Sequence, residues 1–117
     1  MKGRRLPVII DAEGKPRLNI PLEPGDYCGP LIGYTGDLPA VFFLKPNARD
    51  VDAVGIARSI QHVTSPPHTF RECADGSLEI RNSIGDMHDS YDDGNAVTQV
   101  SDGWHGYLNE GHNWEKA

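Results

Sequence analysis

The 117-residue chain lacks several signatures by which enzymes are recognised. No Gly-x-Ser-x-Gly motif presents a nucleophilic serine, and neither cysteine stands in a motif that pairs it with a histidine. The Gly-x-Gly-x-x-Gly fingerprint and the Gly-Lys-Ser ending of a nucleotide-binding loop are also absent. These absences argue against nucleophilic catalysis and against dinucleotide or ATP binding in those modes.

Cysteines and long apolar runs are scarce. Cys28 and Cys73 are too few for a disulfide scaffold and lack Cys-x-x-Cys spacing, so we expect reduced thiols, with a bridge between them left open. No apolar run approaches the ~20 residues of a membrane span, and the first residues lack the apolar core of a signal peptide. We therefore expect a cytoplasmic protein without a membrane partner.

Basic residues are outnumbered by acidic ones: 11 Lys and Arg stand against 17 Asp and Glu, for a formal net charge of −6. Because general binding to nucleic acid or anionic lipid depends on neutralising phosphates, neither is expected as a partner. The one basic cluster, Lys2, Arg4 and Arg5, is typical of a solvated terminus, with a phosphate or RNA contact as the alternative.

Glycine and proline are abundant instead, and 13 Gly and 9 Pro spread along the chain argue against long helices. Only residues 50–59 could form a helical turn or two. Three triplets end in glycine after polar residues, which is typical of a β-hairpin turn closed by a left-handed residue. They are Ala12-Glu13-Gly14, Ala74-Asp75-Gly76 and Asn109-Glu110-Gly111.

Counting outward from each turn predicts which residues face one another. In the first hairpin the predicted pairs are Ile10–Pro16, Val8–Leu18 and Leu6–Ile20, which gather Leu6, Val8, Ile10, Leu18 and Ile20 on one face. In the second they are Phe70–Ile80, Glu72–Leu78 and, on the reverse face, the opposite charges of Arg71 and Glu79. In the third they are Leu108–His112 and Gly106–Trp114, with the indole across the bare glycine and with His105 and Tyr107 on the other face.

The fold class expected from these hairpins is all-β, a small antiparallel sandwich or partly closed barrel formed by one domain over residues 1–117. Long loops are expected near residues 21–29, 46–58 and 85–96. The predicted strands are 6–11, 15–22, 30–34, 40–45, 59–64, 68–73, 77–84, 97–100, 103–109 and 112–115.

Acidic residues and histidines raise the alternative of a divalent metal cofactor. Asp86, Asp89, Asp92 and Asp93 offer hard oxygen ligands in the 85–96 loop, but a calcium-loop register that starts at Asp89 puts Val100 where a bidentate Glu is required. No histidine pair has a zinc-finger or His-Glu-x-x-His spacing. The metal alternative names His68, His88, His105, His112, Asp89 and Asp93.

Aromatic residues suggest a binding surface. Residues of the last hairpin are the candidate contacts for a partner or flat ligand, since Trp and Tyr are enriched at such surfaces: Trp104, His105, Tyr107, His112 and Trp114. The simpler interpretation places most of these aromatic side chains in the core.

The last 55 or so residues carry a recognisable pattern: Ser65-Pro66-Pro67-His68-Thr69-Phe70, Asp75-Gly76-Ser77-Leu78-Glu79-Ile80, Ser83-Ile84, and Trp104-His105-Gly106-Tyr107-Leu108 with Gly111 and Trp114. This pattern resembles small phage and prophage proteins that have no established activity. In this chain Asn82 replaces their usual proline, and the acidic insert before Trp104 is long. The resemblance implies a viral or mobile-element origin and a compact β domain.

Without catalytic spacing, the function expected is that of a non-enzymatic binding module, which acts on a host protein, such as one of a defence system, or on a small ligand, and which could also self-associate. One alternative is a metal-dependent hydrolase or metal-stabilised domain. A second alternative is a minor virion or assembly protein.

Overall fold

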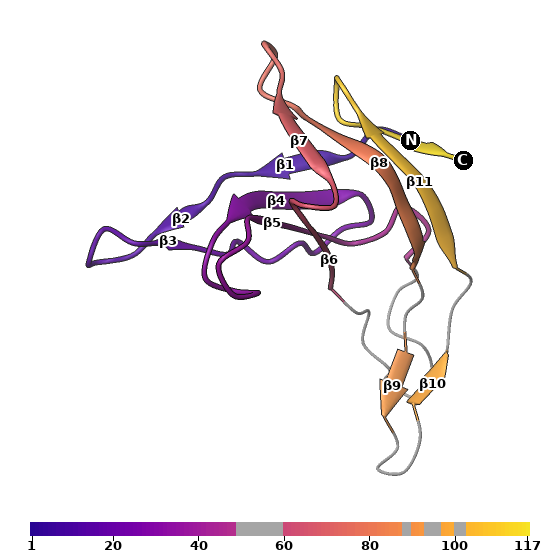
Figure 1. The fold of residues 1–117 in the computed structure, drawn as a ribbon, viewed down its shortest axis with the longest axis horizontal. Coiled ribbons are helices and arrows are strands. Elements are labelled where there is room, and N and C mark those ends of the chain that lie inside the picture. Colours follow the sequence, from indigo (N-terminus) through magenta and orange to yellow (C-terminus); the bar gives the residue numbers. More distant parts are fainter. Residues whose placement is uncertain (49–59, 88–89, 93–96, 100–102) are drawn as a thin grey trace.

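A computed structural model describes residues 1–48, 60–87, 90–92, 97–99 and 103–117. The fold is all-β, as the sequence predicts, and the described part of the chain contains no helix (Figure 1). It therefore holds no helix of the length and apolarity needed to cross a membrane. The helical turn considered for residues 50–59 falls outside the described residues, as do His88, Asp89 and Asp93 of the metal hypothesis.

Two four-stranded sheets form the body. The first has the order β1 (Arg4–Leu6), β4 (Asp26–Leu31), β5 (Ala40–Phe43), β6 (Gln61–Thr64), and the second has the order β12 (Asn113–Lys116), β11 (Trp104–Asn109), β8 (Leu78–Met87), β7 (Thr69–Glu72). Two-stranded ribbons are formed by β2 (Ile9–Ile10) with β3 (Pro16–Arg17) and by β9 (Ser90–Asp92) with β10 (Val97–Gln99). All neighbours are antiparallel except β1 and β4, which run parallel.

The main core lies between the two four-stranded sheets, which makes the body a sandwich rather than a closed barrel. Along β5 and at the start of β8, alternate residues point into it, as the two-residue period of a strand requires. Its buried members are Tyr27, Val41, Phe43, Val63, Leu78, Ile80, Ile84, Trp104, Leu108 and Trp114.

Strand β5 is buried on both faces, and this explains its unbroken apolar run. Val41 and Phe43 point into the main core, whereas Ala40 and Phe42 enter a second cluster with Cys28 and Leu31. Leu6, Val8 and Leu18, from the segments around the β2–β3 ribbon, pack against that second cluster.

The first residues of the chain connect the two sheets. The Gly3 amide donates to the carbonyl of His112 over 2.7 Å, and the Trp114 amide donates to the carbonyl of Met1 over 2.8 Å. From Arg4 onward the same segment pairs with β4. Residues 1–6 therefore run from the edge of one sheet to the edge of the other.

The second hairpin has the predicted register, with Phe70 opposite Ile80 and Glu72 opposite Leu78. The Arg71 guanidinium bonds both carboxylate oxygens of Glu79, at 3.3 and 2.9 Å, on the outer face. The cross-strand charge pair predicted from the Ala-Asp-Gly turn is confirmed.

The predicted register of the third hairpin is wrong by two residues. Leu108 faces Trp114 rather than His112, and the turn consists of Glu110, Gly111 and His112. Two consecutive left-handed residues, Gly111 at φ 83° and His112 at φ 62°, close it one residue later than expected. A two-residue shift leaves every side chain on its predicted face, because the strand period is two.

The indole that lies over Gly106 belongs to Trp104, not to Trp114 as predicted. A Cβ at Gly106 would come within 2.6 Å of Trp104 Cη2. Trp114 instead lies against Gly3, where a Cβ would meet its Nε1 at 2.5 Å. Both glycines are therefore required by close packing of an indole on the backbone.

The first hairpin and two of the predicted loops also need correction. Only Ile9–Arg17 and Ile10–Pro16 pair across the ribbon, and Leu6 pairs with Cys28 of β4 instead of Ile20. The predicted loop over 21–29 is a strand from Asp26 onward, because its backbone finds partners in both β1 and β5. Within the predicted 85–96 loop, β8 continues to Met87 and β9 covers Ser90–Asp92.

Candidate functional site

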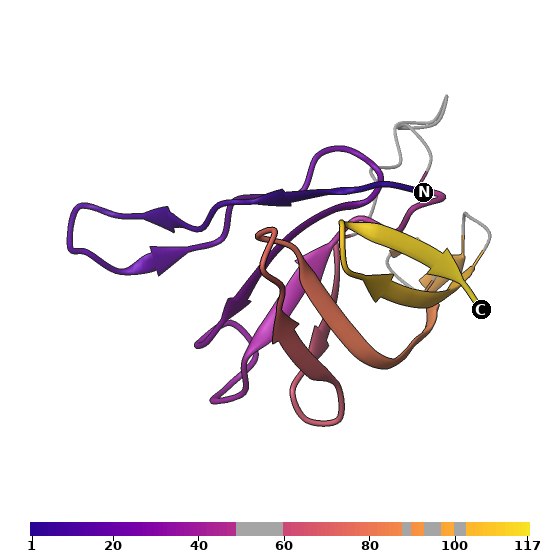
Figure 2. The same ribbon diagram turned by 90° about the horizontal axis from the view of Figure 1, so that it is seen from above.

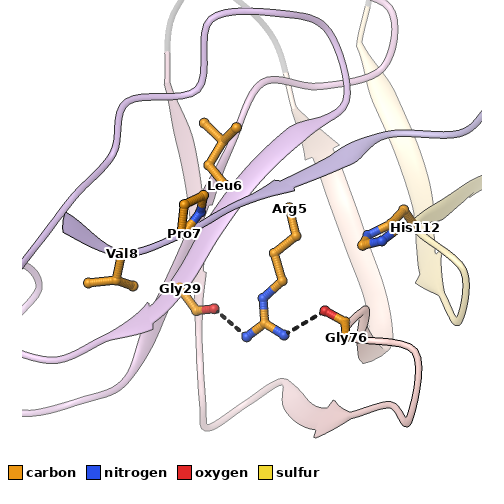
Figure 3. A pocket seen from close by; sticks show the side chains of 7 residues that line it. All are labelled: Arg5, Leu6, Pro7, Val8, Gly29, Gly76 and His112. Carbon is orange, nitrogen blue, oxygen red and sulfur yellow. Dashed lines mark hydrogen bonds between the residues drawn. The ribbon is translucent and has the colours of Figure 1, made fainter.

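A groove of about 470 Å³ opens where the N-terminal strand passes the turns of the second and third hairpins (Figure 3). Its lining comes from four separate parts of the chain: Arg5, Leu6, Pro7, Val8, Gly29, Gly76 and His112. Pro7 and Val8 lead directly into β2, so the groove adjoins the base of the β2–β3 ribbon.

The side chain of Arg5 lies in the groove, and most of its N–H donors already form hydrogen bonds. Its Nη1 donates to the Gly76 carbonyl over 3.1 Å and its Nη2 to the Gly29 carbonyl over 2.8 Å (Figure 3). The same two nitrogens also donate to Glu72, Nη1 to Oε2 over 2.5 Å and Nη2 to Oε1 over 2.7 Å. The bonds to Glu72 raise the pKa of Arg5, and the same bonds lower the pKa of Glu72. Arg5 therefore joins the two sheets and has no pair of Nη donors left for an anion.

A second polar chain runs from the groove into the core. The buried Tyr27 hydroxyl lies 2.7 Å from His112 Nδ1 and accepts the Leu78 amide over 3.2 Å. Burial raises the pKa of Tyr27, so the phenol keeps its proton. Tyr27 thereby links His112 at the groove to the Leu78 amide in the core.

Beside the groove, the turns of the second and third hairpins are linked through Ser77. Its hydroxyl donates to Asp75 Oδ1 over 2.5 Å and accepts the Gly111 amide over 2.9 Å. The hydroxyl and amide of Ser77 lower the pKa of Asp75. This arrangement holds the two turns in a fixed relation.

Cys73, Asp75 and Glu110 are the residues of the described chain that come closest to a metal site, with one ligand atom of each within 4.8 Å of the others. Asp75 already accepts two hydrogen bonds from Ser77. Arg71 lies nearby: its pKa is raised first by its bond to Glu79, and also by Cys73 and Glu110. Exposed carboxylates that are balanced by an arginine do not by themselves indicate an ion.

The histidines of the metal hypothesis are divided between two places. His105 Nε2 lies 3.0 Å from Ser83 Oγ, and His68 Nε2 donates to the Ser83 carbonyl over 3.2 Å, so these two imidazoles flank β8. His112 lies beyond the other end of β11, against Tyr27. Within the described ranges the three do not form one set of ligands.

Two of the five predicted contact residues belong to the core. Trp104 and Trp114 are 5% and 3% exposed, and their rings meet edge to face at 5.5 Å. The Trp114 Nε1 donates to the Gly25 carbonyl over 2.8 Å. His105 is exposed and Tyr107 half-buried on the outer face of β11, whereas half-buried His112 lines the groove. The five residues therefore do not form one contact surface.

The sequence interpretation missed that apolar side chains of the β2–β3 ribbon, and of the loop at its base, are exposed. The ribbon projects from the body in both views (Figures 1 and 2), with Ile9 49% and Ile10 62% exposed. We call ribbon surface the exposed apolar residues of the ribbon and of the 32–38 loop at its base, namely Ile9, Ile10, Ile32, Tyr34 and Leu38. A signal was present: adjacent Ile9 and Ile10 must point to opposite faces of a strand, so a single core cannot bury both.

Hydrogen bonds hold the ribbon in shape despite its exposure. Asp11 Oδ1 accepts the amides of Glu13 and Lys15, each over 2.9 Å, and its Oδ2 accepts Arg17 Nε over 2.8 Å. The amide of Lys15 and the Arg17 side chain lower the pKa of Asp11. At the base, the Leu18 amide donates to the Tyr34 hydroxyl over 2.8 Å. The ribbon is thus a defined structural element.

Comparisons with known proteins do not assign the chain to a family. Family models, curated proteins and solved structures all give no match. The resemblance to small phage proteins stays a prediction, and a functional proposal has to be based on the geometry.

Proposed function

We propose that the protein is a non-enzymatic protein-binding module and that the ribbon surface is its contact region. The observation that carries this proposal is the exposure of adjacent isoleucines on an ordered ribbon that projects from the body. Clustered apolar side chains in water mark interaction sites, since covering them with a partner releases the free energy of their hydration. A host protein is the partner class that the phage resemblance suggests.

The polar groups of the groove support a binding role over catalysis. Arg5 is bonded to Glu72 and two carbonyls, and Tyr27 is bonded to His112 and Leu78. Groups that are committed to one another in this way hold the two sheets together. Among the described residues that line the groove, no base is paired with a nucleophile.

Photo-crosslinking from single positions tests the proposal. A photoreactive residue at Ile10 is expected to give one discrete adduct when the chain is expressed in its host, and the same residue at Arg71, which is exposed on the second sheet, is expected to give none. Ile9→Ser with Ile10→Ser should abolish binding of the captured partner at an unchanged Tm. Equal labelling from Ile10 and Arg71 would contradict the ribbon surface as the contact region.

Binding of a small ligand in the groove is the second candidate, favoured by its volume and by the apolar lining of Leu6, Pro7 and Val8. Native mass spectrometry of the purified chain checks it, with Val8→Trp as a variant that fills the groove. A bound small molecule that Val8→Trp removes would support this candidate. The same mass in wild type and variant, after correction for the substitution, would contradict it.

A further inference from the structure

The hydrogen bonds of the ribbon define which peptide groups point outward. The Asp11 amide donates to the Lys15 carbonyl over 2.9 Å, so residues 11 and 15 face one another through hydrogen bonds and the neighbouring pair of Ile10 and Pro16 does not. The Pro7 carbonyl also points inward, because it accepts Asn19 Nδ2 over 3.0 Å. Odd-numbered residues therefore bond within the ribbon, and the peptide groups of Val8 and Ile10 point away from β3.

The outer edge of β3 is closed to further pairing. Pro16 has no N–H to offer there, and the Leu18 amide, the next outward donor, already bonds the Tyr34 hydroxyl. The outer edge of β2 carries no such protection. Within the described part of the chain no strand pairs with that side of β2, and no backbone partner is found for the amide or carbonyl of Val8 or Ile10.

We propose that β2 pairs antiparallel with β2 of a second copy of this chain, across a two-fold axis, to form a four-stranded sheet in the order β3, β2, β2, β3. This inference rests on the proposed function in taking the ribbon surface as the contact region, and it gives that surface a second copy of the chain, in place of a host protein, as its partner. Edge pairing satisfies the outward peptide groups of both copies at once, and a two-fold arrangement makes one patch complementary to itself.

The outward positions select a register. With Ile9 facing Ile9 of the second copy, Ile10 and Val8 form the hydrogen-bonded pairs on either side of the axis. Pro7 then faces Asp11 at a non-hydrogen-bonded position, where its missing N–H costs nothing. β1 and β2 follow nearly one line (Figure 2), so the tip of each ribbon extends along the other copy toward its β1 strand.

The balanced charge of the ribbon allows two copies of the chain to meet there. Asp11, Glu13, Lys15 and Arg17 sum to zero on the ribbon, although the whole chain carries −6, so the ribbon is a place where two copies can meet without net repulsion.

Sedimentation velocity over a wide range of protein concentration tests the pairing. We expect a reversible dimer, whose affinity Ile10→Pro lowers by about tenfold or more, because proline removes one outward donor from each copy. The inward hydrogen bonds of the ribbon do not use that donor. Pro16→Ala, which changes only the closed edge of β3, is the matched control and should leave the affinity unchanged.

Cysteine variants test the register and do not depend on the proline variant. Residues that face one another at a non-hydrogen-bonded antiparallel position have Cα atoms ~4.5 Å apart, within disulfide range. Mild oxidation should therefore join two copies of Ile9→Cys, whereas Ile10→Cys, which faces Val8, should cross-link poorly; the native Cys28 and Cys73 are buried.

The outcomes separate this inference from the proposed function. A monomer at every concentration, a dimer indifferent to Ile10→Pro, or faster cross-linking of Ile10→Cys than of Ile9→Cys would each overturn the self-pairing. If the photo-adduct at Ile10 then contained a different protein, the binding module would stand without the dimer. A monomer that gave no adduct would remove both.

Discussion

The first and second hairpins have almost the same turn and opposite surroundings. Ala12-Glu13-Gly14 and Ala74-Asp75-Gly76 both place a left-handed glycine at the end of the turn, at φ 78° and 87°. The second hairpin packs Phe70 and Ile80 toward the main core, while the first holds Ile9 and Ile10 out in water. Local turn chemistry therefore sets pairing near the turn, and only the neighbouring elements decide whether a hairpin is buried.

Truncating a side chain of the buried second hairpin should destabilise the fold far more than truncating one of the exposed first hairpin. Ile80→Ala removes a fully buried side chain of the second hairpin, and we expect it to lower the free energy of unfolding by about 2–5 kcal/mol. Ile10→Ser on the ribbon should change it by less than about 0.5 kcal/mol. Urea unfolding of both variants measures the difference, and similar losses would contradict the assignment of the ribbon to the surface.

Glycines sharpen the comparison within the second sheet. A Cβ at Gly106 would collide with the Glu115 carbonyl and the Trp104 ring, whereas at Gly85 on neighbouring β8 a Cβ meets nothing within 4 Å. Gly106→Ala should therefore destabilise the fold by about 1–3 kcal/mol or more, and Gly85→Ala should be close to neutral. Thermal unfolding of the two variants measures this difference in stability. A neutral Gly106→Ala would show that the indole does not lie on the strand.

Acid should weaken the ion pairs that Arg4 and Arg5 of β1 form with Asp26 and Glu72. Burial raises the pKa of Asp26, but the bonds from Arg4 and from the amide of Glu23 outweigh it and hold the pKa below the ordinary 3.8. The bond from Arg5 likewise lowers the pKa of Glu72 from 4.5. Because both pKa values are lower in the folded state, their stabilisation is complete above the ordinary values and is lost as the pH falls below them.

Urea midpoints between neutral pH and about pH 3 measure this dependence. Asp26→Asn should lower the midpoint at neutral pH and flatten its fall in acid. A midpoint that rises with acidification, or an unchanged acid slope in the variant, would contradict the role given to Asp26.

The smallest expected effect concerns the base of the ribbon. Tyr34→Phe removes the acceptor of the Leu18 amide, a bond of about 1 kcal/mol, without touching the main core. Hydrogen exchange of the Leu18 amide should accelerate by about fivefold, while the global Tm stays nearly the same. Ile32→Ser in the same loop, which is 67% exposed, serves as the control. Exchange unchanged by Tyr34→Phe would separate the loop from the ribbon.

The strands that form by short-range pairing were predictable from the sequence, and those that depend on distant neighbours were not. The register of β7 and β8 follows from one turn and one alternating pattern. The first half of β4 reads as a loop because residues 21–29 are rich in Pro and Gly, and it is a strand because β1 and β5 lie on either side. The candidate site shows the same limit: Tyr27 and His112 meet across 85 positions of sequence.

The sequence by itself determined the all-β class, the glycine turns of the first two hairpins, and the faces of the second and third hairpins, because glycine conformation and strand alternation act within a few residues. Tertiary structure decided that the two tryptophans are buried, that the histidines separate, and that the first hairpin leaves the body. Those outcomes depend on contacts between segments far apart in the chain. No local pattern records how much core is left to cover Ile9 and Ile10.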